Sequence, residues 1–283
     1  MSRTVYLNGS FVPLDEARIP IMDRGFLFAD GIYEVSAVLD GRLVDNEAHL
    51  ARLDRSLGEI GIRNPYATAE WIRLETELVA RNDLNEGLVY MQVTRGVAER
   101  DFAFPAADTP PSVVMFTQKK SITGNPLAET GARVVTVEDL RWKRRDIKSV
   151  ALLAQVLAKQ AAAEAGVAEA WMVEDGAVTE GSSSTAFIVT TDRRIVTRPL
   201  STALLPGITR AAVLRLAAEA DLTVEERLFS VEEAHAAEEA FYTSASAFVM
   251  PVVALDDRPI GSGRPGPLTR RLRELYIGMA RGR

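Results

Sequence analysis

The sequence contains no cysteine and only two histidines, His49 and His235. The absence of cysteine excludes disulfides, thiolate nucleophiles and cysteine-bound metals in one step. A serine–histidine hydrolase or a histidine-rich metal site would need one of the two imidazoles, and neither lies in a recognisable nucleophile or metal motif. We therefore predict no metal site, and any chemistry must come from other side chains.

Lysine is also scarce, because only five of the 33 basic side chains are lysines. Arginine is the default cation of this chain, so a position where lysine is chemically required stands out. Lys148 lies at the border between the charged stretch "DLRWKRRDI" and the apolar stretch "SVALLAQVLA". Its amine can be partly desolvated there, which favours the uncharged form that imine formation requires. A solvated lysine at a helix start is the alternative.

A basic excess and long apolar runs are missing too. The net charge of -6 and the pI near 5.2 argue against nucleic-acid binding, which relies on a basic face. No segment has the unbroken apolar length of a membrane span, and the N-terminal "MSRTVYLNGS" lacks the apolar core of a signal peptide. We expect a cytoplasmic protein whose partners are small molecules.

What is present indicates two mixed α/β units. Hairpin signals occur at Asn8-Gly9, Asp40-Gly41 and Asp175-Gly176, and apolar residues recur at helical spacing after Asn46 and over 68–82. The turn-rich segment "KKSITGNPLAETG" separates two parts of this kind. We predict a small N-terminal α/β domain over 1–118, a linker over 119–128, and a larger C-terminal domain over 129–283 with a helix over about 149–165.

Four further residues are candidates for ligand binding. Glu180 lies in "AVTEGSSSTAF", where small residues let a ligand approach the backbone closely. "LLPGITR" places Ile208 and Thr209 at a helix start, where free N–H groups favour a phosphate. Arg52 lies off the apolar stripe of its helix and could clamp a phosphate. An exposed glutamate, an ordinary helix cap and a surface charge are the respective alternatives.

The motifs "RGFLFADGIYEV", "NEAHLARL", "RWKRRDIKS", "TEGSSSTAF" and "PGITR" occur together over nearly the whole chain. This set resembles the fold-type IV pyridoxal-phosphate aminotransferases, and within them the D-amino acid transaminases most closely. The resemblance implies a homodimer of two-domain α/β subunits, each with a barrel-like sheet in its larger domain. It also implies pyridoxal 5'-phosphate as the cofactor.

The resemblance assigns roles to single residues. Lys148 is similar to the lysine that forms a Schiff base with the cofactor and then shuttles a proton. Glu180 is similar to the carboxylate that pairs with the pyridinium nitrogen, and Leu205 to a residue packed on the cofactor ring. The residues that resemble the phosphate-binding cup are Arg52, Ile208, Thr209, Ser244 and Ala245.

Substrate binding is implied for Tyr33 and for Arg100, which in the family reaches across the dimer to the substrate carboxylate. The family has a histidine two positions later, whereas this chain has Phe102. We therefore expect Arg100 and Tyr33 to bind the carboxylate and Phe102 to shape the pocket. The alternative is a solvated Arg100 with Phe102 packed against it.

The implied reaction is a ping-pong transfer of an amino group between a D-amino acid, such as D-alanine or D-glutamate, and a 2-oxo acid. A branched-chain L-amino acid aminotransferase or an aminodeoxychorismate lyase shares the same cofactor motifs and stays an alternative. A non-catalytic protein that binds a phosphorylated ligand is the alternative from another class.

Overall fold

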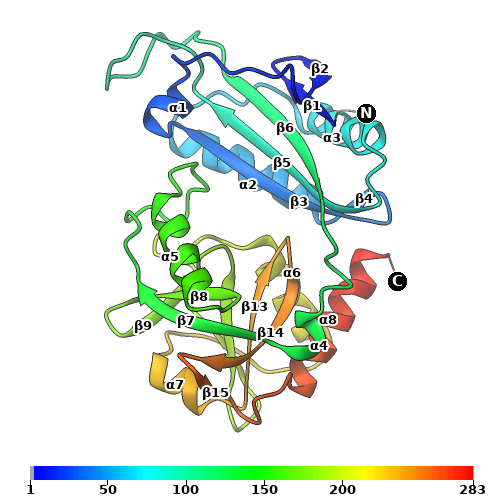
Figure 1. Cartoon of the computed structure of the whole chain (residues 1–283), viewed down its shortest axis with the longest axis vertical. Coiled ribbons are helices and arrows are strands. Elements are labelled where there is room, and N and C mark those ends of the chain that lie inside the picture. Colours follow the sequence, from blue (N-terminus) through cyan, green and yellow to red (C-terminus); the bar gives the residue numbers. More distant parts are fainter. Residues whose placement is uncertain (1–2, 283) are drawn as a thin grey trace. The chain divides into compact units, whose positions relative to one another are not determined.

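The computed structural model describes residues 3–282, and the chain divides into two compact units. The first unit contains the residues up to Ser121 together with Ile147–Ala151. The second contains Ile122–Asp146 and the residues from Leu152 onward. Figure 1 shows both units with most of their elements labelled.

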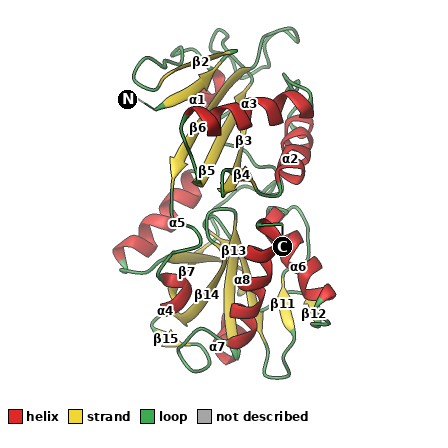
Figure 2. Cartoon of the chain, turned by 90° about the vertical axis from the view of Figure 1, so that its right-hand side faces the viewer, coloured by secondary structure: helices red, strands yellow, loops and turns green. Residues whose placement is uncertain are grey.

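The first unit is an antiparallel sheet covered on one face by two helices. Its strand order is β2-β1-β6-β5-β3-β4. The long helices α2 and α3 both lie on the same face of this sheet (Figure 2). The elements are β1 (Thr4–Leu7), β2 (Ser10–Pro13), α1 (Arg24–Phe28), β3 (Gly31–Leu39), β4 (Arg42–Leu43), α2 (Asn46–Glu59), α3 (Thr68–Arg81), β5 (Glu86–Thr94) and β6 (Ser112–Lys119).

Local sequence explains these elements. Asn8 and Gly9 both have positive φ, 46° and 97°, so the first hairpin has the turn that its residues favour. Leu53 and Leu57 of α2 recur at helical spacing and are fully buried against the sheet, in the same cluster as Leu78 of α3. The predicted hairpin and both predicted helices are confirmed.

The second unit is built on a nine-stranded sheet that curls. Its order is β12-β11-β10-β13-β14-β7-β8-β9, with β15 paired to β14, and β9 also contacts β10. Helices α6 and α8 contact one another, and α5 contacts β7 and β8. The elements are α4 (Leu127–Thr130), β7 (Ala132–Glu138), α5 (Leu153–Glu164), β8 (Glu169–Glu174), β9 (Ala177–Gly181), β10 (Thr185–Val189), β11 (Ile195–Thr197), α6 (Ile208–Glu219), β12 (Val224–Glu226), α7 (Val231–Ala236), β13 (Glu239–Ser244), β14 (Phe248–Leu255), β15 (Arg258–Pro259) and α8 (Pro267–Ala280).

The predicted α/β class with a barrel-like sheet is therefore confirmed, and one detail differs. The helix expected from about residue 149 begins only at Leu153. The preceding residues pair with the start of β3 instead, because the Tyr33 N–H donates to the Lys148 carbonyl and the Val150 N–H donates to the Gly31 carbonyl, each at 3.0 Å. Lys148 thus belongs to the first unit, whereas the predicted domain ranges placed it in the second.

Within residues 3–282, no helix combines the length and the apolar character that crossing a bilayer requires.

Candidate functional site

Lys148 is held beside the start of β3 by its own backbone. Besides the bond from Tyr33, its N–H donates to the Ser56 hydroxyl of α2 at 3.4 Å. Its side chain is half-buried, and its Nζ lies 4.2 Å from the centroid of the Tyr33 ring. An ammonium over an aromatic face is attracted by the negative face of the ring. Two residues that were predicted from separate motifs are therefore neighbours.

A row of stacked rings extends from Tyr33 across the sheet. Tyr33 stacks on Tyr90 of β5 at 5.7 Å between centroids, and Tyr90 stacks on Phe116 of β6 at 4.7 Å. Burial raises the pKa of Tyr90, so its hydroxyl stays protonated and donates to the Gln92 side chain at 2.8 Å. The row forms a flat aromatic wall that begins at the Lys148 amine.

Arg52 is bound by a buried carboxylate that the sequence did not single out. Glu34 of β3 is fully buried, and Arg52 donates to it from Nε at 2.7 Å and from Nη2 at 2.8 Å. His49, one turn earlier on α2, contacts the same carboxylate at 2.8 Å through Nδ1. Burial alone would raise the pKa of Glu34, but Arg52 and His49 outweigh it and hold that pKa well below its usual range. Arg52 is thus an oriented cation and not a solvated surface charge.

Glu180 of β9 is also buried and paired with an arginine. Arg141 donates to its Oε1, and the Leu205 N–H donates to the same oxygen at 3.1 Å. Arg141 itself is held by Asp139 through Nε at 2.9 Å and Nη2 at 2.7 Å. Burial raises the pKa of Glu180, and the Arg141 guanidinium acts in the opposite direction. Oε1 accepts both of these hydrogen bonds, so Oε2 is the oxygen that can accept a hydrogen bond from a ligand.

Helix α6 begins without a side-chain cap. Its N-cap is Gly207, with φ -63° and ψ 130°, so Ile208 and Thr209 are the first helical residues, the former half-buried and the latter buried. A Cβ at Gly207 would lie 2.8 Å from the hydroxyl of Thr185, which leaves no room for a side chain at this helix start. Thr185 is paired with Thr243 of β13, whose buried hydroxyl has no partner within residues 3–282. Helix α6 contacts β13, so its start without a side-chain cap lies in a polar environment that favours an anion.

Ser244 is the last residue of β13, and Ala245 is the first residue of the turn between β13 and β14. Both are half-buried, and the Ser244 hydroxyl lies 3.4 Å from that of Ser246. Ser244 pairs with Phe248 across the turn, and β13 is in contact with α6. The structure thus places the second-unit members of the predicted phosphate cup on adjoining elements.

Arg100 and Phe102 are not joined to Tyr33 or Lys148 by any hydrogen bond or ring contact within residues 3–282. The Arg100 guanidinium lies 5.3 Å from the Phe28 ring centroid and 5.6 Å from that of Phe102. Phe102 is 80% exposed. Both residues therefore lie on an exposed loop of their own unit.

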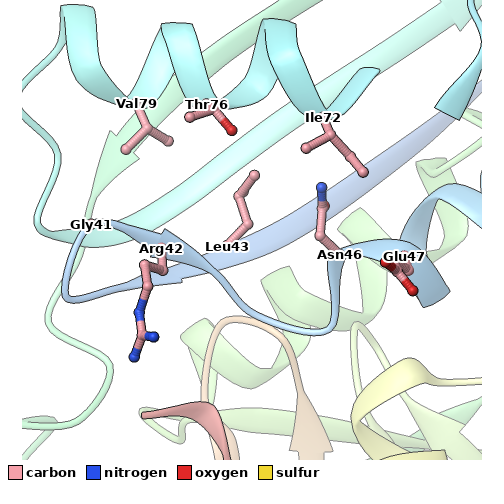
Figure 3. A pocket seen from close by; sticks show the side chains of 8 residues that line it. All are labelled: Gly41, Arg42, Leu43, Asn46, Glu47, Ile72, Thr76 and Val79. Atoms are coloured by element: carbon pink, nitrogen blue, oxygen red, sulfur yellow. The ribbon is translucent and has the colours of Figure 1, made fainter. Parts of the chain in front are cut away.

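A separate cavity of about 380 Å³ lies elsewhere in the first unit. Figure 3 shows its walls, which come from the β3–β4 turn, the start of α2 and one face of α3. None of the predicted site residues lines it. Its lining residues are Gly41, Arg42, Leu43, Asn46, Glu47, Ile72, Thr76 and Val79.

Sequence reasoning missed Glu34, His49 and Arg141. His49 was noted only because imidazoles are rare, and Arg141 stands among several basic residues in "RWKRR". The spacing of His49 and Arg52, which puts both on one side of a helix, is the one local signal that could have linked them. Glu34 and Glu180 receive their partners from distant segments, so no local pattern could reveal these pairs.

Comparisons with known proteins identify the family of the chain. The sequence model of the family described as amino-transferase class IV matches residues 31–255. D-alanine aminotransferase of Staphylococcus aureus (strain MSSA476) is 41% identical over 272 residues, which cover 96% of both chains. D-alanine aminotransferase of Bacillus licheniformis is 41% identical over 271 residues, covering 95% of this chain and 94% of that one. The crystal structure of the T.th. branched-chain amino acid aminotransferase with pyridoxamine 5'-phosphate gives a TM-score of 0.92 at 26% identity, covering 100% of this chain and 95% of that chain.

Proposed function

We propose that this chain, which belongs to the class IV aminotransferases, transfers an amino group between a D-amino acid and a 2-oxo acid with pyridoxal 5'-phosphate as its cofactor. The observation that carries the proposal is the half-buried Lys148 amine beside the Tyr33 ring, in a chain about 41% identical to D-alanine aminotransferases over nearly its full length. D-Alanine and D-glutamate are the substrates that we expect.

The residues of the structure fit this cofactor by their chemistry. A pyridoxal phosphate needs an amine for its aldehyde, an anion for its ring nitrogen and donors for its phosphate. Lys148 offers the amine, Glu180 the buried carboxylate, and the uncapped start of α6 the donors. The glycine at this helix start and the unpartnered Thr243 hydroxyl suit a ligand with oxygen acceptors.

When bound, the cofactor supplies an electron sink for the substrate α-carbon. The chain's own residues then divide the remaining work. The Lys148 amine would hold the cofactor and, when free of it, would move a proton between the substrate α-carbon and the cofactor. The Glu180 carboxylate would keep the ring nitrogen protonated, and Leu205 would contact the ring.

We assign phosphate binding to the cup formed by Arg52, Ile208, Thr209, Ser244 and Ala245. Its N–H donors at Ile208, Thr209 and Ala245 and its hydroxyls at Thr209 and Ser244 orient the phosphate, and Arg52 adds a fixed positive charge.

Substrate selection falls to Tyr33, Arg100 and Phe102. An arginine binds a carboxylate through two charge-assisted hydrogen bonds, whereas phenylalanine offers no donor and makes the pocket more apolar. Since Arg100 lies on an exposed loop and makes no hydrogen bond or ring contact with Tyr33, we propose that it serves the site of a partner subunit in a homodimer. Exposed apolar side chains on the same unit, Phe26, Phe102 and Phe104, support an interface there. A cytoplasmic location remains part of the proposal.

A branched-chain L-amino acid aminotransferase is the second candidate, because a solved structure of that activity superposes on this chain with a TM-score of 0.92. Adding one substrate at a time to the purified, cofactor-loaded protein separates the candidates. We expect D-alanine to bleach the cofactor absorbance and release pyruvate, and L-leucine to leave it unchanged. Bleaching by L-leucine alone would favour the branched-chain activity, and no response to either would favour a non-catalytic phosphate binder.

A further inference from the structure

We propose that Arg273 of α8 is a positioning residue that holds the turn between β13 and β14 in the shape that binds the phosphate of the cofactor. The inference rests on the proposed function, because it takes Ser244 and Ala245 at this turn as members of the phosphate cup. It gives a task to a buried arginine near the end of the chain that neither the motifs nor the comparisons single out.

The Arg273 guanidinium donates to backbone carbonyls of two segments. Nη1 donates to the carbonyls of Ala247 and Val249 at 2.9 and 2.8 Å. Nη2 donates to the carbonyls of Ile122 and Thr123 at 2.7 and 3.3 Å. The arginine is only 7% exposed. One buried side chain therefore ties the end of the turn and the start of β14 to the segment that precedes α4.

The backbone that Arg273 binds has an unfavourable conformation. Phe248 lies between the two carbonyls that accept from Nη1, and its φ of 58° is a left-handed value at which a bulky side chain is crowded. Such a conformation persists only where the surrounding structure holds it. The buried Phe248 ring packs against Tyr276 of α8 at 4.8 Å between ring centroids. The same helix thus holds both the backbone and the side chain at this position.

This strained position is joined to the phosphate cup by the turn itself. The Ala247 N–H donates to the Ser244 carbonyl at 3.3 Å, and Ser244 pairs with Phe248 across the turn. A rotation of the backbone at Phe248 would therefore move the Ser244 hydroxyl and the Ala245 N–H. Helix α8 contacts β13, β14 and α6, so it lies against both elements that carry the second-unit donors of the cup.

Arginine suits this task because its planar guanidinium donates in several fixed directions at once. Arg273→Met keeps an apolar stem and removes the donors of four carbonyls, and a buried polar group without its partner is unfavourable. Arg273→Lys keeps the charge, but its donors share one nitrogen and cannot reproduce the fork that reaches both segments. We therefore expect the turn to relax most in Arg273→Met and less in Arg273→Lys.

The experiment compares two ligands that differ only in the phosphate. Pyridoxal 5'-phosphate and pyridoxal are titrated separately into the full-length protein after removal of its cofactor, and binding is followed by absorbance. We expect Arg273→Met to lower the ratio of the first affinity to the second about tenfold, which corresponds to about 1.4 kcal/mol, and Arg273→Lys to lower it about threefold. A role in stability alone would weaken both ligands equally.

Two controls separate the position of the turn from general effects. Ile195→Ala removes buried volume from β11, and its partner Val189 lies opposite Glu239, at the other end of β13 from the cup. This variant should be less stable than the parent and keep the parent's affinity ratio. Arg271→Met removes an exposed arginine of the same helix and should also leave the ratio unchanged.

The outcomes distinguish this inference from the proposed function. An unchanged ratio in the Arg273 variants, equal losses for both ligands, or a ratio lowered as much by Ile195→Ala would overturn the positioning role. If Arg273→Met does not fold, the change expected for Arg273→Lys decides. Failure of the proposed function looks different, because the parent protein itself would then bind neither ligand or bind both equally, and the inference would fail with it.

Discussion

Three charged residues of the candidate site are held by partners from other elements. Lys148 is fixed through its backbone to Tyr33, Arg52 is gripped by Glu34, and Glu180 is paired with Arg141. The last two pairs are buried, and breaking such a pair from one side leaves an uncompensated charge. Substitutions at Glu34 and Arg141 should therefore affect the site even though neither residue is expected to touch substrate.

A buried glutamate close to Glu34 makes the free energy of unfolding depend on pH. Glu75 is fully buried, its Oε2 accepts from the Asn46 amide at 2.7 Å, and its Oε1 has no partner within residues 3–282. Burial raises its pKa to about 8, and the nearby Glu34 charge acts in the same direction. The folded chain thus holds a proton that the unfolded chain releases near pH 4.5.

We therefore predict that the free energy of unfolding falls as pH rises from about 4.5 to about 8, with this group contributing up to about 1.4 kcal/mol per pH unit. Glu75→Gln, which stays neutral, should lose this contribution and gain stability relative to the parent at pH 8. Urea unfolding at pH 5 and pH 8 measures it. The control is Glu77→Gln, which changes a half-buried, ion-paired glutamate of the same helix. Parallel pH dependences of the parent and Glu75→Gln would refute the assignment.

At the scale of secondary-structure elements, two helices of the second unit start alike and differ in their capping. Both α6 and α8 follow a glycine in extended conformation, Gly207 and Gly266. The N–H groups of Leu268 and Thr269 in α8 donate to the buried Glu239 carboxylate at 3.0 and 2.8 Å. The start of α6 has no side-chain cap. An external anion can bind at α6, whereas an internal one already occupies the start of α8.

This contrast predicts that two isosteric Thr→Val substitutions, one at the start of each helix, differ in their effect on cofactor affinity. Thr209→Val should weaken binding of pyridoxal 5'-phosphate by roughly tenfold, because it removes a hydroxyl from the proposed cup and leaves its volume almost unchanged. Thr269→Val, at the start of α8, should leave that affinity unaltered. Absorbance titration of both variants measures the effect, and equal affinities for Thr209→Val and its parent would remove Thr209 from the cup.

How far the elements could be predicted depends on the range of the interactions that form them. The turn at Asn8-Gly9 and the stripe of α2 are local, and both follow from the sequence. The late start of α5 could not be predicted, because the residues around Lys148 are bound by the backbone of β3, more than a hundred positions earlier. The motifs located Lys148, Arg52 and Glu180, but the partners that orient them come from other elements.

At the scale of the whole molecule, the proposed homodimer places Arg100 in the site of its partner. Arg100→Ala alone should raise the Michaelis constant for D-alanine by the equivalent of about 1.5–3 kcal/mol, since a charged hydrogen-bonding partner is lost. Lys148→Ala alone should be inactive. If Arg100 acts across the interface, mixed dimers of the two variants contain one intact site.

We therefore predict that mixing the two variants under conditions that exchange subunits restores part of the parental activity at low D-alanine concentration. Sedimentation of the mixture verifies that dimers have formed. Arg55→Ala, which removes an exposed arginine of α2, mixed with Lys148→Ala serves as the control for unspecific effects. A mixture of Arg100→Ala and Lys148→Ala no more active than its components would show that Arg100 does not serve the partner's site.

The central claim is that Lys148 is the residue to which the cofactor is attached. Borohydride reduction of the cofactor-loaded protein, followed by proteolysis and peptide mapping, tests it most directly, because reduction fixes the pyridoxyl group on the lysine that holds it. We predict that the label is found on Lys148 and is lost in Lys148→Ala, whose fold should be intact. A label on Lys119, Lys120, Lys143 or Lys159, or equal labelling of the parent and Lys148→Ala, would contradict the account.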